Sequence, residues 1–442
     1  MPNLLATRRG RLTAFFFLYL TEGIPLGFTA TAVATYMRRL GLGPEEIGGF
    51  VASLYLPWAF KWVVGPIVDV IAPNRFGRRR AWIVGAQVLM ILSLAAAIPV
   101  DFVAELGLFT TLIMVHNAFG ATQDVAIDAL ACEVLDEKER GFANGLMFGG
   151  AYLGQAIGGA GVLFVCDALS ESLGAAGALR ASFGLVIAVL LCVTVFVAWP
   201  LREVPRPQAP AVGPALPRVM GELWSFVRQA VGSFFKSRGA AVGVLLALLP
   251  SGALGLSLAI GSNLAVEFGL GDDDIATVGL FSSVLAGGFC VLGGRLSDTV
   301  GRRAILTLSY LTMAGVTVGM AYIMWRHGWN MPLRKEELGK VAVPGALVTA
   351  YWVLTLAYSI PQGLAYGVKS AVFMDVTNPA VAATQFTAYM ALSNLAISYS
   401  AKWMGWAAER WGYPQTLLVD AAIGTLCLLC LPFMMKPSVK AA

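Results

Sequence analysis

The sequence carries little charge and few of the residue types that build enzyme sites. Only 13% of its 442 residues are charged, against about a quarter in an ordinary soluble protein. Two histidines, His116 and His327, are too few for a histidine-rich metal cluster. No Gly-x-x-x-x-Gly-Lys-Ser/Thr phosphate loop occurs. We therefore expect no enzyme, no metal site, no cofactor and no nucleotide-driven pump.

Cysteine is also scarce. The six cysteines lie in apolar blocks or at their ends, which is not the spacing of a disulfide framework. Cys427 and Cys430 form a close pair, but no partner ligands for a metal lie near them in the sequence. We expect this pair to be small core residues.

Hydrophobic residues make up 57% of the chain and come in blocks. Each block is roughly 20 residues long, the length that crosses a bilayer as a helix. The first block follows Arg8, Arg9 and Arg11 and is too long for a signal peptide, so we expect it to be a retained span. The pattern predicts an all-α polytopic membrane protein whose twelve spans begin near Leu12, Ile47, Ala81, Phe109, Phe142, Phe183, Gly239, Ile275, Ala304, Val341, Val381 and Gln415.

The basic residues indicate orientation and location. If both termini are cytoplasmic, most of the 31 Lys and Arg fall in inner segments, as positive-inside topology requires. The net charge of +5 is then a topology signal, not a nucleic-acid footprint. We expect a multi-pass protein of a bacterial inner membrane, monomeric, with lipid rather than nucleic acid around it.

A linker divides the chain. The Pro-rich stretch from Leu201 to Arg218 is predicted to hold neither helix nor strand. An amphipathic helix follows and is predicted to lie on the inner membrane surface. Its apolar face comprises Val219, Leu223, Phe226, Val227, Ala230, Val231 and Phe234. These features predict a six-helix bundle over 1–200, a cytoplasmic linker over 201–238 and a second six-helix bundle over 239–442.

The two halves share local features. Pro25 and Pro250 are each predicted to interrupt the first span of their half. Paired interruptions of this kind often mark a central transporter site, although packing kinks are the alternative.

A charged motif recurs after the second span of each half. It reads "GGRLSDTVGRR" from Gly293 and, more loosely, "GPIVDVIAPNRFGRRR" from Gly65. An aspartate, a glycine turn and arginines can pair two adjacent spans in one conformation and release them in another. The alternative is a basic loop with incidental acids. The candidate gate residues are Asp69, Arg78, Arg79, Gly294, Asp298, Gly301, Arg302 and Arg303.

This motif resembles the signature loop of the major facilitator superfamily, Gly-x-Leu-x-Asp-Arg-x-Gly-Arg-Arg. Thr299 stands in place of the first arginine. The resemblance implies two pseudo-symmetric six-helix bundles and transport by alternating access.

Three further stretches resemble AmpG-type muropeptide permeases and their acetyl-CoA-transporter relatives. They are "LPWAFKWVVGPIVD" from Leu56, "ATQDVAIDALACEVLDEKERG" from Ala121 and "TNPAVAATQFTAYMALSNL" from Thr377. The resemblance implies proton-coupled import of a bulky polar or anionic small molecule. Siderophore importers share this architecture, and a drug or metabolite exporter of the same fold is a further alternative.

Acids inside spans need a reason, because a charge at mid-span costs roughly 2.5–3.5 kcal/mol. Glu22 lies near the middle of the first span and is a candidate proton carrier or substrate contact, or a packing residue. Asp124 and Asp128 share one helix face, so their mutual repulsion favours a proton on one of them. Lys61 should lie at the depth of Asp124. An ion pair there would leave Asp128 free to exchange protons.

The second half supplies bases where the first supplies acids. Lys369 aligns next to the position of Asp128 and could bind an anionic group of the substrate, or could snorkel to the inner face. Lys402 is a similar but weaker candidate. Asn117, Gln123 and Gln385 offer hydrogen bonds within spans, although some such groups only join helices.

Overall fold

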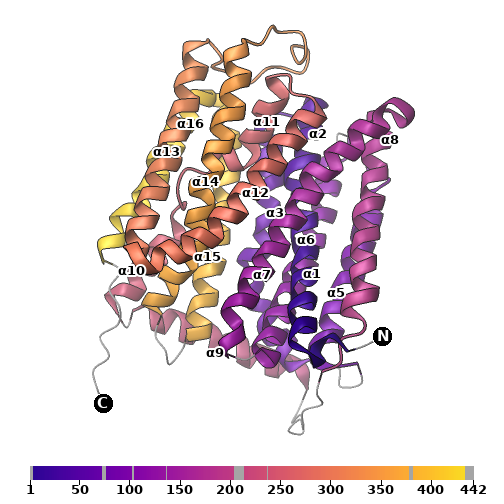
Figure 1. The fold of residues 1–442 in the computed structure, drawn as a ribbon, viewed down its shortest axis with the longest axis vertical. Coiled ribbons are helices and arrows are strands. Elements are labelled where there is room, and N and C mark those ends of the chain that lie inside the picture. The colour runs from indigo at the N-terminus through magenta and orange to yellow at the C-terminus, as the bar shows by residue number, and fades with distance from the viewer. Residues whose placement is uncertain are drawn as a thin grey trace. The chain divides into compact units, whose positions relative to one another are not determined.

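The computed structural model describes residues 3–71, 76–101, 104–135, 137–203, 214–235, 237–377 and 382–433 (Figure 1). These residues form helices joined by short segments, with no strand among them, so the all-α prediction is confirmed. The helices are α1 (Arg8–Gly27), α2 (Ala34–Arg39), α3 (Pro44–Ala59), α4 (Lys61–Val70), α5 (Arg78–Ala97), α6 (Leu106–Val134), α7 (Glu137–Ala156), α8 (Val162–Val193), α9 (Ala215–Phe234), α10 (Arg238–Leu248), α11 (Ala259–Glu267), α12 (Asp272–Leu296), α13 (Arg302–Arg326), α14 (Gly345–Val376), α15 (Ala382–Trp411) and α16 (Tyr413–Leu426).

The predicted spans match these helices closely. The largest difference in a starting position is in the sixth span, expected near Phe183 and beginning at Ala176. That span and the one before it are joined in α8 at Gly174, where a φ of +68° reverses the chain. Among the described residues, eight helical segments are long and apolar enough to cross a membrane on their own.

The other predicted spans are α6, α14, α15 and the interrupted pair α10 and α11. The three long helices have 29, 32 and 30 residues, enough to cross a bilayer. They carry most of the candidate site residues: Asp124 and Asp128 in α6, Lys369 in α14, and Gln385 and Lys402 in α15.

The chain forms two compact units. Unit 1 comprises residues 1–32 and 60–226, and unit 2 comprises residues 33–59 and 227–442. The first crossing between units falls within a π-helical turn, η2 (Phe28–Val33). The second falls at Phe60, a turn residue between α3 and α4. Each of the first two spans therefore changes unit at an irregular point in its helix.

Unit 1 is held together by close helix crossings. α1 packs along α7, and α5 packs along α6. Side chains on Gly23 or Gly27 would overlap the backbone of α7 at Ala151 or Gln155, and one on Gly154 would overlap α1 at Leu20. Small residues at such crossings let membrane helices approach until their backbones touch. Phe15, Leu18, Ile127, Leu130 and Met147 belong to the buried core beneath this crossing.

Unit 2 uses the same device. α3 packs along α15 at Gly48 and Gly405, where either added side chain would strike the facing backbone. α14 packs along α12 and α13, and α2 packs along α11. Residues 33–59, from the first two spans, are thus built into the body of the second half.

The predicted interruption of the first span by Pro25 is wrong. α1 continues through Pro25 into η2, and the Thr29 hydroxyl donates to the Pro25 carbonyl at 2.7 Å. The wider π-turn accommodates the proline without ending the helix. Pro250 does mark a break, because α10 ends at Leu248 and α11 begins only at Ala259.

The linker prediction also needs correction. Residues 204–213 lie outside the described part of the chain, but 215–218 form the first turn of α9 instead of an irregular segment. The predicted amphipathic helix is present. However, Val219 and Ala230, from the face expected to meet the membrane, are buried against the protein.

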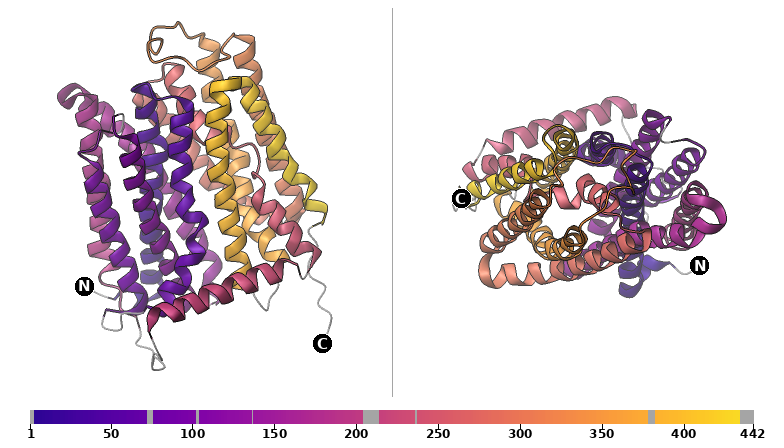
Figure 2. Two further views of the ribbon diagram at one scale, coloured as in Figure 1. Left: turned by 180° about the vertical axis from the view of Figure 1, so that it is seen from behind. Right: turned by 90° about the horizontal axis from the view of Figure 1, so that it is seen from above.

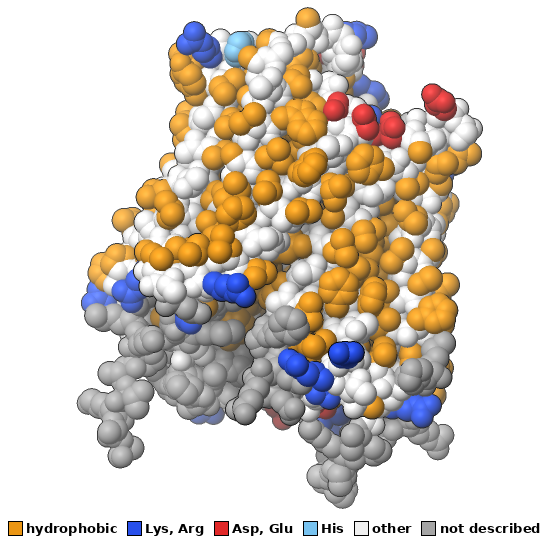
Figure 3. Space-filling model, in the orientation of Figure 1, with side chains coloured by type: hydrophobic (Ala, Val, Ile, Leu, Met, Phe, Trp, Pro, Cys, Tyr) orange, Lys and Arg blue, Asp and Glu red, His pale blue; other side chains and the backbone are white. Residues whose placement is uncertain are grey.

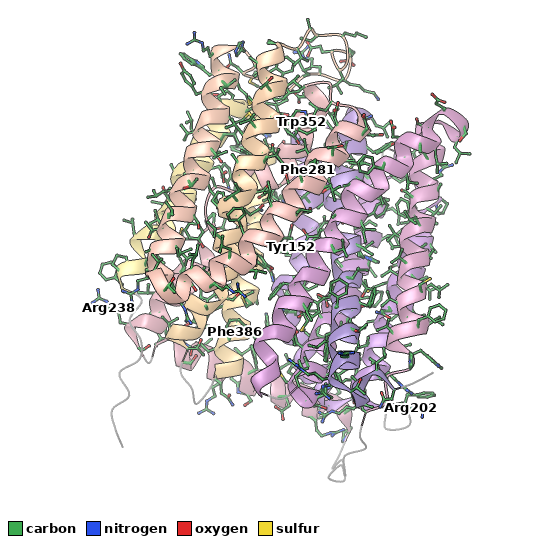
Figure 4. All side chains as sticks on the ribbon, in the orientation of Figure 1. Tyr152, Arg202, Arg238, Phe281, Trp352 and Phe386 are labelled. Atoms are coloured by element: carbon green, nitrogen blue, oxygen red, sulfur yellow. The ribbon has the colours of Figure 1, made fainter. Side chains whose placement is uncertain are left out.

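The helix flanks are apolar, as a bilayer requires. In Figure 3 hydrophobic side chains cover much of the helix sides, and the charged side chains in view lie near helix ends. Figure 4 labels two such basic residues, Arg202 and Arg238. The backbone of Arg202 exchanges two hydrogen bonds with the Asn3 side chain, both 3.0 Å, which fasten the N-terminal segment of unit 1.

Candidate functional site

Four ionisable residues come together inside unit 1. We call Glu22, Lys61, Asp124 and Asp128, from α1, α4 and α6, the carboxylate cluster. Lys61 Nζ lies 2.9 Å from Asp124 Oδ2, and both side chains are largely buried. The sequence argument from matching helix depths expected this ion pair. A turn at Phe60 ends α3, so Lys61 is the first residue of α4.

Asp128 has a different partner. One turn along α6 from Asp124, its Oδ1 accepts a hydrogen bond of 2.5 Å from the Tyr19 hydroxyl of α1. Tyr19 itself is buried in the core of unit 1. Asp128 is therefore held by a neutral donor, whereas Asp124 is held by a cation.

Glu22 has one carboxyl oxygen that lacks a hydrogen-bond partner among the described residues. This atom, Oε1, is buried, and the Glu22 carboxyl interacts electrostatically with Asp124, Asp128 and Lys61. Beside it, Gln123 Nε2 donates to Thr21 Oγ1 at 3.0 Å and to the Leu18 carbonyl at 3.4 Å, so Gln123 joins α6 to α1.

The charges of the carboxylate cluster do not balance. Lys61 neutralises one carboxylate, and two acids remain, Glu22 and Asp128, with no second cation paired to them among the described residues. Uncompensated charge in a low-dielectric interior costs several kcal/mol, so such groups neutralise by holding a proton. This arrangement can therefore store at least one exchangeable proton.

The candidate residues of unit 2 are more scattered. Lys369 is half-buried, with its Nζ 5.8 Å from the centre of the Phe373 ring and no ion pair among the described residues. Lys402 is exposed on α15. Gln385 donates to the Tyr389 hydroxyl at 2.9 Å, and Tyr389 donates to the Ala240 carbonyl at 3.0 Å, which joins α15 to α10.

Asn117, the remaining polar candidate, bonds within its own helix. Its Nδ2 donates to the Ile113 carbonyl at 2.9 Å. The acids of the carboxylate cluster belong to unit 1, and Lys369, Lys402 and Gln385 belong to unit 2.

The first charged motif forms a compact network in unit 1. Arg79 Nη2 lies 2.6 Å and Arg78 Nη2 lies 3.3 Å from Asp69 Oδ1. Arg79 also pairs with Glu133 at the end of α6, with Nε and Oε1 3.2 Å apart. Gly77 turns the chain ahead of these arginines with a φ of +88°. The network thus connects α4, α5 and α6.

Glu203 completes this network and was not predicted. The backbone N–H groups of Arg79 and Arg80 donate to its carboxylate at 2.9 and 2.6 Å. An anion at a helix N-terminus satisfies otherwise free N–H groups and complements the helix dipole. Glu133 was also missed, although its place at the end of the aspartate-bearing span could have indicated it.

The second copy of the motif is described in part. Gly301 has a φ of +104° ahead of α13, like Gly77 ahead of α5. Arg302 Nη1 donates to the Ala371 carbonyl of α14 at 3.0 Å. Arg303 occupies the first turn of α13, and Gly294 lies near the end of α12. The side chain of Asp298 lies outside the described residues.

A buried ion pair in unit 2 was missed altogether. Arg38 Nε lies 3.1 Å from Glu267 Oε1, and its Nη2 donates to the same oxygen. The two side chains are 1% and 0% exposed. The Tyr413 hydroxyl donates to Glu267 Oε1 at 2.6 Å, and Trp329 Nε1 donates to Oε2 at 3.2 Å. We call Arg38, Glu267, Trp329 and Tyr413 the Arg38–Glu267 cluster; it fastens α2 to α11 and α16.

The break between α10 and α11 is also built around a missed acid. Asp420 of α16 is buried, and its carboxylate accepts from the backbone N–H groups of Leu254 at 3.2 Å and Gly255 at 2.7 Å. The Tyr358 hydroxyl donates to the Ala253 carbonyl at 2.5 Å. These side chains satisfy backbone groups that a helix would otherwise pair.

Curated relatives of the chain include a permease and a putative transporter. It is 24% identical over 421 residues to the anhydromuropeptide permease of Escherichia coli (strain K12), covering 95% of this chain and 79% of that protein. It is 25% identical over 304 residues to the putative transporter AmpG 4 of Rickettsia conorii, covering 66% and 68% of the two chains.

Solved transporter structures share the fold. A D-xylose–proton symporter superimposes with a TM-score of 0.72 at 14% identity, covering 97% of this chain and 98% of the other. The nucleoside transporter NupG gives 0.63 at 12% identity, covering 96% and 98%. A family model for the major facilitator superfamily matches residues 12–401. The chain therefore belongs to the major facilitator superfamily and is a secondary transporter, not an enzyme.

Proposed function

We propose that this protein imports a bulky polar or anionic solute of the anhydromuropeptide type together with protons. The observation that carries the proposal is the charge imbalance of the carboxylate cluster. Three carboxyl groups and one ammonium group share the interior of unit 1, and only the Lys61–Asp124 pair is neutral by itself. A proton taken up and released there links transport to the proton gradient.

Asp128 is the coupling acid in this proposal. Its partner, Tyr19, donates one hydrogen bond and carries no charge, so Asp128 can change protonation without leaving a buried cation unpaired. Asp124 cannot do so, because its protonation would leave Lys61 uncompensated. Glu22 is the nearest additional site for a proton.

Lys369 supports an anionic substrate. A half-buried lysine without a carboxylate partner among the described residues is a favourable point for a carboxylate or phosphate of the solute. The resemblance to anhydromuropeptide permease, at 24% identity, favours a solute that carries sugar and peptide. We place both termini on the cytoplasmic side of a bacterial inner membrane and expect the protein to act as a monomer.

Transport by alternating access requires an interface that opens. In this proposal residues 33–59 separate from the rest of unit 2 during the cycle, which breaks the Arg38–Glu267 cluster. We place the network of Asp69, Arg79 and Glu133 at the other ends of the helices. In this proposal it stays assembled while the Arg38–Glu267 cluster is broken, and it breaks only while that cluster is assembled.

Uptake of a labelled anhydromuropeptide into cells that express the protein tests this function. We expect accumulation of the solute against its concentration gradient, which a protonophore abolishes and which the Asp128→Asn variant lacks. Asp167→Asn, which makes the same change at an exposed position in α8, is the matched control and should transport normally. Absence of uptake by a correctly inserted wild-type protein would exclude this solute, and siderophores would be tested next.

A further inference from the structure

The linker helix α9 carries a second apolar surface that the protein does not cover. Leu216, Met220, Trp224 and Val231 of α9, and Phe235 in the turn directly after it, are 72%, 57%, 69%, 48% and 84% exposed. At 100° per residue these positions fall within a sector of roughly 100° around the helix axis. We call these five residues the apolar stripe.

The apolar stripe is distinct from the face that packs on the protein. On that other face Val219 and Ala230 are buried. Phe226 stacks on Trp62, with ring centres 5.7 Å apart and an interplanar angle of 9°. α9 therefore has one apolar face that packs on the protein and a second that the protein leaves exposed. The second face is stable only in contact with another apolar phase.

The direction of α9 shows where that surrounding lies. The helix is bent by 109° relative to α10, the first part of a membrane span (Figure 2). A helix nearly perpendicular to a span, and only a few residues from it, lies along the membrane plane at the level of the headgroups. Arg238, labelled in Figure 4, begins α10, and its guanidinium lies 4.7 Å from the centre of the Phe433 ring.

The charge beside the apolar stripe favours one class of lipid. Arg228 is exposed and lies roughly 20° beyond the edge of the stripe at helical spacing. The acidic residue of α9, Glu222, lies on the far side of the helix, roughly 140° from the same edge. A basic side chain bordering an interfacial apolar surface reaches anionic headgroups while its stem stays in the apolar layer.

We propose that the apolar stripe is a lipid-binding surface, immersed in the interface of an anionic phospholipid bilayer, with Trp224 at headgroup depth and Arg228 on lipid phosphate. Tryptophan favours this depth because its ring is apolar and its indole N–H is polar. α9 is then a membrane-surface helix as well as a connection between the halves.

Lipid quenching of tryptophan emission tests the proposal. The full-length protein is reconstituted in bilayers that contain phosphatidylglycerol brominated near the headgroup, and the Trp224→Phe variant is compared with wild type. We expect the variant to lose a component of emission that the brominated lipid quenches. Trp329→Phe removes a buried tryptophan instead and should leave the quenched component unchanged.

Mixed bilayers test the charge. With brominated phosphatidylglycerol diluted into phosphatidylcholine, Arg228→Gln should lower the preference for the anionic lipid at Trp224 about fivefold, the effect of one basic residue near an anionic surface. An equal preference in both proteins would refute the role of Arg228. A Trp224 component quenched by aqueous iodide but not by lipid would overturn the proposal. A component shielded from both quenchers, with dimers in solution, would assign the stripe to a second copy of the chain.

Discussion

The Arg38–Glu267 cluster should control how readily residues 33–59 separate from the rest of unit 2. The perturbation is Glu267→Gln, which keeps the shape of the side chain and removes its charge. Arg38 is then left as a buried cation, 1% exposed, with no charged partner among the described residues of the cluster. Breaking a buried ion pair in this way costs roughly 3–5 kcal/mol.

This cost destabilises only the state in which the Arg38–Glu267 cluster is assembled. In the opened state Arg38 meets water, and the substitution costs little there. Since each 1.4 kcal/mol is a factor of ten, the balance should shift toward the opened state by roughly two to three and a half orders of magnitude. The double variant R38Q/E267Q buries no charge and should fall between Glu267→Gln and wild type.

Cysteine accessibility measures this shift. Ser398 of α15 is buried, and its hydroxyl donates to the Ala52 carbonyl of α3 at 2.8 Å, so Ser398→Cys reports on separation of these helices. Labelling by a membrane-impermeant maleimide should accelerate strongly when Glu267→Gln is added. The protein that retains Ser398 gives the background from its native cysteines.

Glu171→Gln, at an exposed position in α8, is the matched control and should not change the labelling rate. If Glu267→Gln leaves the rate unchanged while the protein remains inserted and folded, the Arg38–Glu267 cluster does not govern opening. A lower unfolding temperature without faster labelling would lead to the same conclusion.

Three further predictions concern the helix break, a helix crossing and the charged motif. Asp420→Ala should lower the unfolding temperature measured in detergent, because each buried N–H left without an acceptor costs about 1–3 kcal/mol. Asp420→Asn, which keeps an acceptor oxygen, should recover part of the loss. Equal stability of the wild type and both variants would contradict this. Gly405→Ala should destabilise the protein in the same assay, whereas Gly85→Ala, with open space at its Cβ position, should not; similar effects would refute the crossing argument. Arg79→Gln should reduce uptake about tenfold, the equivalent of about 1.4 kcal/mol, because Arg79 is 7% exposed and pairs with both Asp69 and Glu133. Arg78→Gln should change uptake little, because the Arg78 side chain is 34% exposed and pairs with Asp69 alone among the described residues; the reverse order would contradict the network.

Much of the fold could be predicted, because span-length apolar blocks are a strong signal. Lys61 and Asp124 were brought together by counting residues from the ends of their spans, and the structure places their side-chain atoms 2.9 Å apart. This succeeds because a membrane helix fixes depth by residue number. Depth, however, does not say which helices are neighbours.

The missed residues show that limit. Arg38 and Glu267 pair across 229 positions and lie near the ends of apolar blocks, where charge is ordinary. Asp420 stands within an apolar block, and its role depends on a break in a different span. In α9 two apolar faces lie side by side, and periodicity alone could not tell which of them packs on the protein. Pro25 was predicted to break a helix that a π-turn keeps continuous.

The central claim is that proton movement through the carboxylate cluster drives solute uptake. The most direct measurement is the internal pH of proteoliposomes when the labelled anhydromuropeptide is added outside without an imposed gradient. Wild-type protein should acidify the lumen as the solute enters, and Asp128→Asn should exchange solute across the bilayer without moving protons. Solute entry with no pH change in wild type, or unaltered acidification by the variant, would contradict the account.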